Sequence, residues 1–427
     1  MTEKKYTKES APQESRQLEK EIKRYDKLIL LKPDFAEAYY NRGLLFLQLS
    51  RLKEAIKSYD KAIQIKPGLA EAYNNRGIAL QELGRLDLAV ESYDKAIQIK
   101  PDYEGAYHNL GIALRELGQL EQSIVSCNQA IQIKPDYAEA YLNLGVSLQE
   151  LGQPEKAIKN YGKAAQIKPD YAEAYLNLGV SLLDLGQLEQ SIVSCKKAIQ
   201  LNPNSKTAQH ILNYLLGSDS QSAPEEYIKN LFNRNAQIYE NRLLNELGYT
   251  VPSLFKNTLS NLGFLSNKFN KTIDLGCGTG LVGVELRNIV NTLIGIDLSE
   301  KMIRKAQEKN VYDELVVDDL IRGLETLKIN FNLFVVADVF TYLGNLCPLF
   351  NSVNKYTKSS SLLIFSTEDV SGDSFFLRKT GRFAHSKNYI LSMASNYGFQ
   401  LEHFEKHPLR KDKGEWVAGG IYILRRV

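Results

Sequence analysis

The pattern of apolar and polar positions changes once along the chain, near residue 217. Before that point apolar residues recur at helical spacing in units of equal length, and each unit closes at a proline. After it, short apolar runs alternate with amphipathic segments, as in NTLIGIDL followed by SEKMIRKAQEKN. The first pattern predicts paired helices, and the second predicts parallel strands joined by helices.

The first half repeats every 34 residues, as its prolines show: Pro33, Pro67, Pro101, Pro135, Pro169 and Pro203. Within each unit a tyrosine is followed four residues later by a glycine, and an alanine stands five residues before the next proline. Glycine and alanine at fixed places let two helices cross closely, and proline ends the second helix. Each unit is therefore expected to be a helix–turn–helix.

These offsets resemble those of the tetratricopeptide-repeat (TPR) family over about residues 18–217. The resemblance implies an all-α solenoid of five full repeats, with part of a repeat before them and a lone capping helix after them. Residues 1–17 are expected to form a disordered tail. The polar stretch at 218–226 is expected to be a linker.

One row of the repeat is asparagine in every unit, namely Asn41, Asn75, Asn109, Asn143 and Asn177. A scaffold has no evident need for an amide there, because the neighbouring position varies among Tyr, Asn, His and Leu. In TPR solenoids a similar row lines the concave groove and grips a peptide backbone, since an amide both donates and accepts. A second row is mostly acidic (Gln48, Glu82, Glu116, Glu150 and Asp184), which predicts a basic guest. The alternative is that both rows face solvent and recur only because the near-identical repeats share a common ancestor.

The second half, residues 227–427, is expected to be a Rossmann-like, doubly wound α/β domain. Residues 227–262 would form a helical lid, and 271–427 the catalytic sheet. The segments FQLEHFEKH and WVAGGIYILRR close the chain without an intervening helix, which predicts an antiparallel strand pair at an edge. The fold class of the whole chain is thus an α solenoid followed by an α/β domain.

Acidic residues end the first two expected strands of this half. Asp274 closes the first strand before a turn rich in glycine (Gly276, Gly278), and Asp297 ends the second strand. Glycines let a ligand approach the backbone, and the next helix offers its N-terminus. A Gly-x-Gly-x-x-Gly pattern also begins at Gly278, so a dinucleotide site is an alternative. A carboxylate at Asp274 would repel a pyrophosphate but suits the ammonium group of a methionine moiety.

The runs DLGCGTG, IDLS, VVDDL and FVVADVFTYLG resemble the successive motifs of class I S-adenosylmethionine-dependent methyltransferases. The resemblance implies a site in which each contact falls on a matching residue. Asp274, Gly276 and Gly278 would hold the methionine part, Asp297 the ribose, Leu298 the adenine face, and Asp318 or Asp319 the adenine amino group, with Ala337 and Asp338 at the mouth. Tyr239, in the lid, would close over the cofactor carboxylate. The alternative for Tyr239 is an aromatic residue of an amphipathic helix packing on the sheet.

His385 is the leading candidate for a general base, and Asp338 is the second. Bacterial TPR–methyltransferase fusions carry a similar Gly-Arg-x-Ala-His-Ser stretch, so the resemblance implies that Arg382 and His385 contact the substrate. The segment after the fourth strand lacks the motifs of amino-methylating DNA enzymes, cytosine C5 methyltransferases and arginine methyltransferases. The methyl acceptor is therefore open.

Composition adds little to this interpretation. The net charge of +3 does not indicate nucleic acid, and no apolar run approaches the ~20 residues of a membrane helix. The N-terminus has no apolar signal region. The four cysteines and five histidines form no metal-binding cluster, and Cys127 and Cys195 occupy a repeat position that is Tyr elsewhere. We therefore expect a cytoplasmic, metal-free protein.

Three functions remain open from the sequence. The first is an active methyltransferase whose TPR groove recruits a peptide or protein. The second is a TPR scaffold for protein–protein interaction with a cofactor-sensing, catalytically silent methyltransferase-like domain. The third is a nucleotide-dependent oxidoreductase on a Rossmann-like sheet.

Overall fold

The structure, a computed structural model, describes residues 11–217, 220–266, 268–412 and 414–427. It divides into two compact units, Met1–Ala174 and Tyr175–Val427. The boundary lies inside a helix of the last repeat, whereas the sequence suggested a division near residue 217. The second unit therefore contains the end of the solenoid as well as the α/β part.

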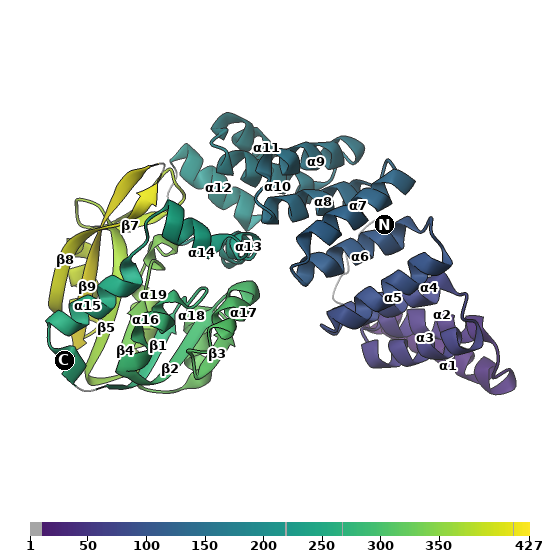
Figure 1. Cartoon of the computed structure of the whole chain (residues 1–427), viewed down its shortest axis with the longest axis horizontal. Coiled ribbons are helices and arrows are strands. Elements are labelled where there is room, and N and C mark those ends of the chain that lie inside the picture. The colour runs from purple at the N-terminus through teal and green to yellow at the C-terminus, as the bar shows by residue number, and fades with distance from the viewer. Residues whose placement is uncertain (1–10, 218–219, 267, 413) are drawn as a thin grey trace. The chain divides into compact units, whose positions relative to one another are not determined.

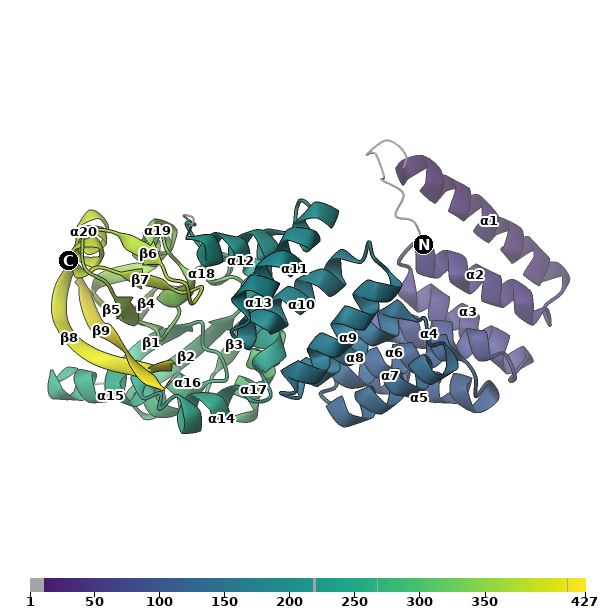
Figure 2. The ribbon, with the colours of Figure 1, turned by 90° about the horizontal axis from the view of Figure 1, so that it is seen from above.

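Helices stack in chain order through the first unit (Figures 1 and 2). They are α1 (Ala11–Leu31), α2 (Ala36–Gln48), α3 (Leu52–Ile65), α4 (Ala70–Glu82), α5 (Leu86–Ile99), α6 (Glu104–Glu116), α7 (Leu120–Ile133), α8 (Ala138–Glu150) and α9 (Pro154–Ile167). The pairs continue with α10 (Ala172–Asp184) and α11 (Leu188–Leu201), followed by the single helix α12 (Lys206–Leu216). Five helix pairs, α2/α3 to α10/α11, thus stand where five full repeats were predicted.

Helix α1 begins at Ala11, so the expectation of a disordered tail is wrong for residues 11–17. This stretch contains Gln, Glu and Arg, which favour helix, and its proline stands in the first turn, where a missing N–H costs nothing. The rest of the predicted tail, residues 1–10, lies outside the described residues.

Close helix crossing in each repeat depends on its glycine. A Cβ on Gly77 would lie 2.5 Å from the ring of Tyr93, which is fully buried. In another repeat a Cβ on Gly111 would lie 2.8 Å from Sγ of Cys127. The free cysteines Cys127 and Cys195 are both buried, so they pack as small apolar side chains where other repeats have Tyr.

The α/β part of the second unit contains many short elements. Its helices are α13 (Glu225–Asn235), α14 (Tyr239–Asn241), η1 (Arg242–Glu246), α15 (Val251–Asn261), η2 (Phe264–Ser266), α16 (Leu281–Leu286), η3 (Arg287–Ile289), α17 (Glu300–Glu308), α18 (Leu320–Leu327), η4 (Phe340–Tyr342), α19 (Cys347–Lys355) and α20 (Lys387–Asn396). Its strands are β1 (Phe269–Leu275), β2 (Val290–Asp297), β3 (Glu314–Val317), β4 (Phe331–Val336), β5 (Thr357–Asp369), β6 (Phe375–Leu377), β7 (Phe383–His385), β8 (Phe399–Asp412) and β9 (Glu415–Arg426).

The sheet runs in the order β3-β2-β1-β4-β5-β7-β6. Strands β1 to β5 are parallel, and the chain moves outward from β1 to β3 before it returns to the other side of β1 at β4. In open parallel sheets a ligand binds beyond the carboxyl ends of the strands where the order reverses. The topology therefore places the binding edge beside the ends of β1, β2 and β4.

Apolar residues alternate between the two faces of this sheet. Phe334 and Val336 of β4 join a core with α18, α19 and α20, whereas Leu333 and Val335 join a core with α15 and α16. Helices thus cover both faces, as Figure 2 shows, and the predicted doubly wound architecture is confirmed.

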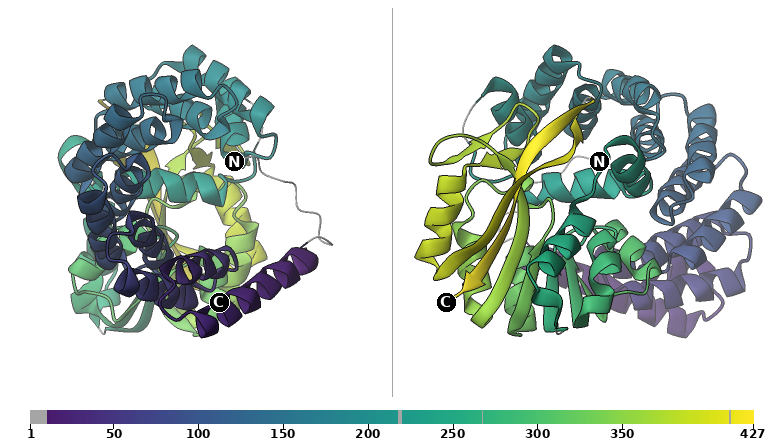
Figure 3. Two further views of the ribbon diagram at one scale, coloured as in Figure 1. Left: turned by 90° about the vertical axis from the view of Figure 1, so that its right-hand side faces the viewer. Right: turned by 60° about the vertical axis from the view of Figure 1, so that its left-hand side comes forward.

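Strands β8 and β9 form the antiparallel pair predicted at the end of the chain. They run side by side as a long twisted ribbon, yellow in Figure 3, and β9 also pairs with β5 in antiparallel orientation. Arg410, on strand β8 of this ribbon, is fully buried. The pair therefore also contributes a residue to the candidate site.

The end of the solenoid, including helix α12, shares a core with the α/β part. Ile211 and Tyr214 of α12 cluster with Tyr227 of α13 and Leu377 of β6. A Cβ on Gly381, in the turn between β6 and β7, would lie 3.0 Å from the ring of Tyr214. The predicted linker ends in this packing, because Ala223 N–H donates to the Tyr342 carbonyl at 2.9 Å and α13 begins at Glu225.

Candidate functional site

Asp274, at the end of β1, is completely buried. Its Oδ2 accepts a hydrogen bond from the Tyr312 hydroxyl at 2.7 Å, but its Oδ1 has no partner among the described residues. Burial raises the pKa of Asp274 to about 7, against the lowering effect of the Tyr312 hydrogen bond. An unpartnered buried carboxylate oxygen is costly, so this position suits a cationic ligand group such as an ammonium.

The turn after Asp274 requires glycine. Gly276 has φ +76°, and a Cβ there would lie 2.4 Å from Cγ2 of Val339. Its N–H donates to the Ile296 carbonyl at 2.8 Å, and Gly278 N–H donates to Oδ2 of Asp297 at 2.9 Å. The turn therefore lies against the end of β2 and leaves no side chain between its backbone and a ligand.

Asp297, at the end of β2, is held by backbone groups on both oxygens. Besides Gly278, Ser299 N–H donates to its Oδ1 at 2.8 Å, and the Ser299 hydroxyl caps α17. Burial raises the pKa of Asp297 to about 6, and these backbone N–H groups act in the opposite direction. Each oxygen keeps a further lone pair for a hydroxyl group. Leu298 is half-buried directly beside this carboxylate.

Asp318 and Asp319 stand after β3, and both have structural partners. Asp319 caps α18, because its Oδ1 accepts the N–H groups of Ile321 and Arg322 at 2.9 and 3.3 Å. Asp318 accepts from Nε of Arg322 at 2.9 Å. The expected adenine contact would therefore have to use an oxygen that these bonds leave over, for instance Oδ2 of Asp319.

Tyr239 lies in α14, within the helical segment expected as a lid. Its ring packs edge-on against Phe232 at 5.7 Å, and Phe232 packs likewise against Tyr342 at 5.4 Å. Burial, followed by the nearby Tyr342 and Asp338, raises the pKa of Tyr239. Tyr239 also packs against the apolar core on the α15–α16 face, as its second interpretation expected, and its closing over a cofactor stays a prediction.

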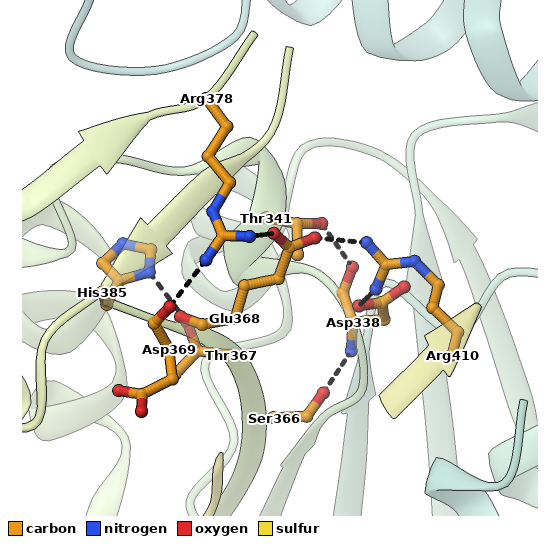
Figure 4. A network of polar contacts seen from close by, with 9 residues as sticks. All are labelled: Asp338, Thr341, Ser366, Thr367, Glu368, Asp369, Arg378, His385 and Arg410. Atoms are coloured by element: carbon orange, nitrogen blue, oxygen red, sulfur yellow. Dashed lines mark hydrogen bonds and ion pairs between the residues drawn. The ribbon is translucent and has the colours of Figure 1, made fainter. Parts of the chain in front are cut away.

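A network of ion pairs lies beyond the ends of β4 and β5 (Figure 4). Arg410 donates to Oδ1 of Asp338 at 2.6 Å and also to Oε1 of Glu368, and Arg378 lies 3.4 Å from Oε2 of Glu368. The backbone of Asp338 is left-handed at φ +58°, and its N–H donates to the Ser366 hydroxyl at 2.8 Å. Such a conformation is costly for a residue other than glycine and is frequent at functional sites. Ala337, just before it, is half-buried.

Glu368 and Arg410 are not among the residues predicted from the sequence. Glu368 carried a usable signal, because it stands at the end of a parallel strand, on the same edge as Asp274 and Asp297. Arg410 carried none, since the charged run around it is typical of an exposed hairpin. Only the β8–β9 register shows that its side chain is buried.

His385 does not have the surroundings expected of a general base. It is completely buried in β7, its Nδ1 lies 2.8 Å from the Thr367 hydroxyl, and its Nε2 lies 3.0 Å from the Gly344 carbonyl. A carbonyl only accepts, so Nε2 carries the proton and Nδ1 accepts from Thr367. Burial lowers the pKa of His385 to about 4. We correct the sequence interpretation: both ring nitrogens are engaged, and His385 holds β5 and β7 together.

In the first unit, the asparagine row connects neighbouring repeats. Nδ2 of Asn75 donates to the Tyr40 hydroxyl at 3.0 Å, and Nδ2 of Asn109 donates to Oδ1 of Asn74 at 3.0 Å. Nδ2 of Asn143 lies 3.5 Å from Nε2 of His108. Each partner is the variable residue that precedes the asparagine of the previous repeat. The expectation that a scaffold does not need this amide is therefore wrong. Asn41 and Asn177 occupy corresponding half-buried positions.

The first unit contains a hollow of about 350 Å³ between α4 and α6. Its lining is part apolar and part amide or carboxylate: Ile78, Gln81, Glu82, Tyr93, Asn109, Ile112 and Glu116. Two members of the acidic row already have partners within the solenoid. Gln81 donates to Glu116 at 3.1 Å, and Arg115 donates to the buried Glu150 at 3.1 Å. Glu82 is exposed at the hollow.

Comparison with known families accounts for both halves. Tetratricopeptide-repeat models match residues 36–69, 70–103, 92–125 and 172–205, and a TPR-repeat model matches 111–152 and 148–186. A methyltransferase-domain model matches residues 266–410, which include Asp274, Asp297 and Asp338. The chain joins TPR repeats to a methyltransferase domain.

Individual relatives cover parts of this arrangement. A protein of Geobacillus sp. (strain WCH70) named as a methyltransferase is 26% identical over 188 residues, which is 41% of this chain and 74% of that protein. The structure of YrrB, titled a TPR protein with an unusual peptide-binding site, is 24% identical, covers 44% of this chain and 96% of its own, and has a TM-score of 0.38. A thermophilic TPR protein of Thermus thermophilus is 23% identical, covers 42% of this chain and 98% of its own, and has a TM-score of 0.36.

Two further features of the TPR–methyltransferase chain bear on its ligands. Within the described ranges, no three His, Cys, Asp or Glu side chains are grouped so that they would hold a metal ion. In the same ranges, no helix has the length and apolar character needed to cross a membrane.

Proposed function

We propose that the methyltransferase domain binds S-adenosylmethionine and methylates an acceptor that enters beside Asp338. The observation that carries this proposal is the buried, unpartnered Oδ1 of Asp274 next to a turn that only glycine can form. When bound, the cofactor would supply a methyl group on a sulfonium, whose carbon a nucleophile of the acceptor attacks in line as the neutral thioether leaves.

Each proposed polar contact uses an oxygen lone pair that the hydrogen bonds of the described residues leave over. Asp274 Oδ1 would take the ammonium group of the methionine part, with Gly276 and Gly278 giving room for it. Asp297 would accept the ribose hydroxyls, with its carboxylate already oriented by two backbone N–H groups. We further propose that Leu298 packs on the adenine and that Asp319, or its neighbour Asp318, accepts the adenine amino group. Tyr239 would cover the cofactor from the helical segment.

On the acceptor side, we propose that Asp338 orients the incoming group. Arg410 fixes the direction of its carboxylate, and Ser366 fixes its backbone. Much of the catalysis in an in-line methyl transfer lies in holding nucleophile and methyl aligned. A role in alignment needs no proton transfer, which is consistent with the buried and fully engaged His385.

For the TPR solenoid, we propose that the hollow between α4 and α6 binds a peptide or protein segment with a basic side chain. Ile78 and Ile112 offer apolar surface, and the Asn109 amide suits a main-chain group. Exposed Glu82 offers a negative charge at the rim. Concave solenoid surfaces are the usual binding faces of such repeats.

Isothermal titration with S-adenosylmethionine tests the cofactor part of the proposal. Asp297→Ala should weaken binding by about tenfold or more, since it removes charge-assisted hydrogen bonds. The matched control is Glu314→Ala, which removes an exposed acid at the opposite end of the neighbouring strand β3. Tight NAD(H) binding without S-adenosylmethionine binding would overturn the proposal in favour of an oxidoreductase.

Activity is tested by incubating the full chain with cofactor labelled at the methyl group and a cell extract. An acceptor that gains label with the wild type and not with Asp297→Ala supports the enzyme. Cofactor binding without any labelled acceptor supports the second candidate, a TPR scaffold with a cofactor-sensing, silent domain.

A further inference from the structure

The hydrogen bond on Oδ2 of Asp274 belongs to a chain of donors with a fixed direction. The N–H of Gly283, in α16, donates to the Tyr312 hydroxyl oxygen at 3.1 Å, and this hydroxyl donates to Oδ2 of Asp274 at 2.7 Å. A backbone N–H can only donate, so among the described residues the Tyr312 proton has one acceptor, the Asp274 carboxyl. Oδ2 therefore accepts, and a proton that neutralises Asp274 sits on Oδ1.

The backbone on either side of Tyr312 is held by contacts that involve no ligand. Tyr312 stands between α17 and β3, and Arg287 donates to the carbonyl of the preceding Val311 at 3.3 Å. The following Asp313 makes two bonds with Leu293 of β2. Its N–H donates to the Leu293 carbonyl at 2.9 Å, and its Oδ2 accepts the Leu293 N–H at 2.7 Å. The position of Tyr312 is thus set by the fold.

The ring of Tyr312 fills a space that two glycines leave open. A Cβ on Gly283 would lie 2.5 Å from Cζ of Tyr312, and a Cβ on Gly295, in β2, would lie 3.0 Å from its Cδ1. Burial, followed by the charge of Asp274, raises the pKa of Tyr312, so the hydroxyl keeps its proton. Tyr312 is therefore a fixed donor beneath the glycine turn.

Four groups from different elements face Asp274: Tyr312, Asp297 of β2, Cys277 of the glycine turn and Tyr249 ahead of α15. Burial raises the pKa of Cys277 and of Tyr249 well above their ordinary values, so both stay neutral. Burial also raises the pKa of Asp274 to about 7, and the charge of Asp297 acts in the same direction. The Tyr312 hydrogen bond lowers it, so Tyr312 is the one of these four groups that favours the ionised carboxylate.

We propose that Tyr312 is a positioning residue for the cofactor, an inference that rests on the proposed function. Its hydroxyl occupies Oδ2 of Asp274 and leaves Oδ1, which has no partner among the described residues, for the ammonium group of the methionine part. The ammonium group and a proton then compete for the same oxygen atom. Wherever Asp274 starts protonated, binding replaces the proton on Oδ1 and releases it to solvent.

The test is calorimetry of the full chain with S-adenosylmethionine, in pairs of buffers that differ in ionisation enthalpy. The difference in heat between two buffers at one pH gives the number of protons released. We expect wild type to release about one proton per ligand at pH ~6 and almost none at pH ~8, because the pKa of Asp274, about 7, lies between them. Methylthioadenosine has the adenosine part but no ammonium group, so it is the matched ligand and should release no proton from Asp274.

Tyr312→Phe keeps the ring between the glycines and removes the hydroxyl. We expect this variant to bind S-adenosylmethionine about tenfold or more weakly at neutral pH, because the carboxylate loses a hydrogen bond to its charged form. Its proton release should persist at pH ~8, and its affinity for methylthioadenosine should change little. Tyr422→Phe is the matched control, since it removes the hydroxyl of a buried tyrosine of β9 in the core with α18, α19 and α20. This control should behave as wild type.

Wild type that binds S-adenosylmethionine without releasing a proton at pH ~6 overturns the inference and leaves the proposed function standing. Equal affinity of wild type and Tyr312→Phe also overturns it. So does an equal loss of affinity for both ligands with unchanged proton release, because the hydroxyl then only supports the turn. If Tyr312→Phe does not fold, Gly283→Ala takes its place, since the added Cβ displaces the Tyr312 ring. Failure of wild type to bind S-adenosylmethionine at any pH contradicts the proposed function itself.

Discussion

Asp338 and Arg410 stand 72 positions apart in the sequence, yet Nη1 of Arg410 donates to Oδ1 of Asp338 at 2.6 Å. The bond ties the end of β4 to the terminal β8–β9 ribbon. Because the same guanidinium also holds Glu368 of β5, three strands meet at one buried side chain. The terminal ribbon is therefore part of the proposed site.

Replacing Arg410 with methionine is expected to destabilise the methyltransferase domain by about 3–5 kcal/mol, because it leaves two carboxylates without their buried partner. The loss of stability is measured by denaturant unfolding, from the transition of the methyltransferase domain. Arg425→Met is the control, since that arginine pairs with Glu402 at the half-exposed surface and should cost about 1 kcal/mol or less. Equal losses in the two variants would contradict the importance given to the Asp338–Arg410–Glu368 network.

The stability of the cofactor-free chain should fall as pH rises from about 4 to about 7. The pKa of Asp274 in the folded state, about 7, lies above its ordinary value of 3.8, so the folded state binds the proton more tightly. The stability that this proton contributes is present below pH ~4 and is lost as pH rises through the folded pKa. Asp274→Asn keeps the site neutral and removes this loss.

Melting temperatures of wild type and Asp274→Asn across this pH range provide the test. The variant should melt higher at pH 7.5, with the difference vanishing near pH 4, and should no longer bind S-adenosylmethionine. A difference that is constant with pH would show that Asp274 does not titrate as its burial predicts.

His385→Ala should act through stability and not through proton transfer. The change removes the donor to the Gly344 carbonyl and, among the described residues, leaves the Thr367 hydroxyl with the Glu368 carbonyl alone at 3.3 Å, at a cost of about 1–3 kcal/mol. His407→Ala is the control, because within the part of the chain that the structure describes that ring bonds only the adjacent Pro408 carbonyl. Once an acceptor is known, the pH dependence of kcat/KM should be the same in wild type and a folded His385→Gln variant. An acid limb that disappears in the variant would restore His385 as a base.

Glu82→Lys should weaken capture of a basic peptide by the TPR solenoid with little change in stability, since Glu82 is exposed at the rim of the hollow. Glu91→Lys on α5 makes the same charge change at an exposed position that does not line the hollow. Peptide binding measured by fluorescence anisotropy distinguishes the two. Equal weakening by both variants would mean that overall charge, and not this hollow, determines binding.

The sequence by itself determined the architecture of both halves. The spacing of glycine, alanine and proline requires helices that cross closely. In the fold, Gly77 lies against the ring of Tyr93 at such a crossing. The Asp274 turn can also be predicted from the sequence, because an acid followed by glycines at the end of a strand is a local pattern. Local geometry suffices for such features, since the residues concerned are near one another in the chain.

Only the tertiary structure decided which polar groups are free to act. His385 was the leading candidate for a base until the fold enclosed it between Thr367 and Gly344, and the asparagine amides proved to have partners in neighbouring repeats. Arg410 has no distinguishing local pattern, because its partners Asp338 and Glu368 come from strands far away in the sequence. A side chain's chemistry depends on its desolvation and its partners, and both are set by packing between segments that the sequence does not show to be neighbours.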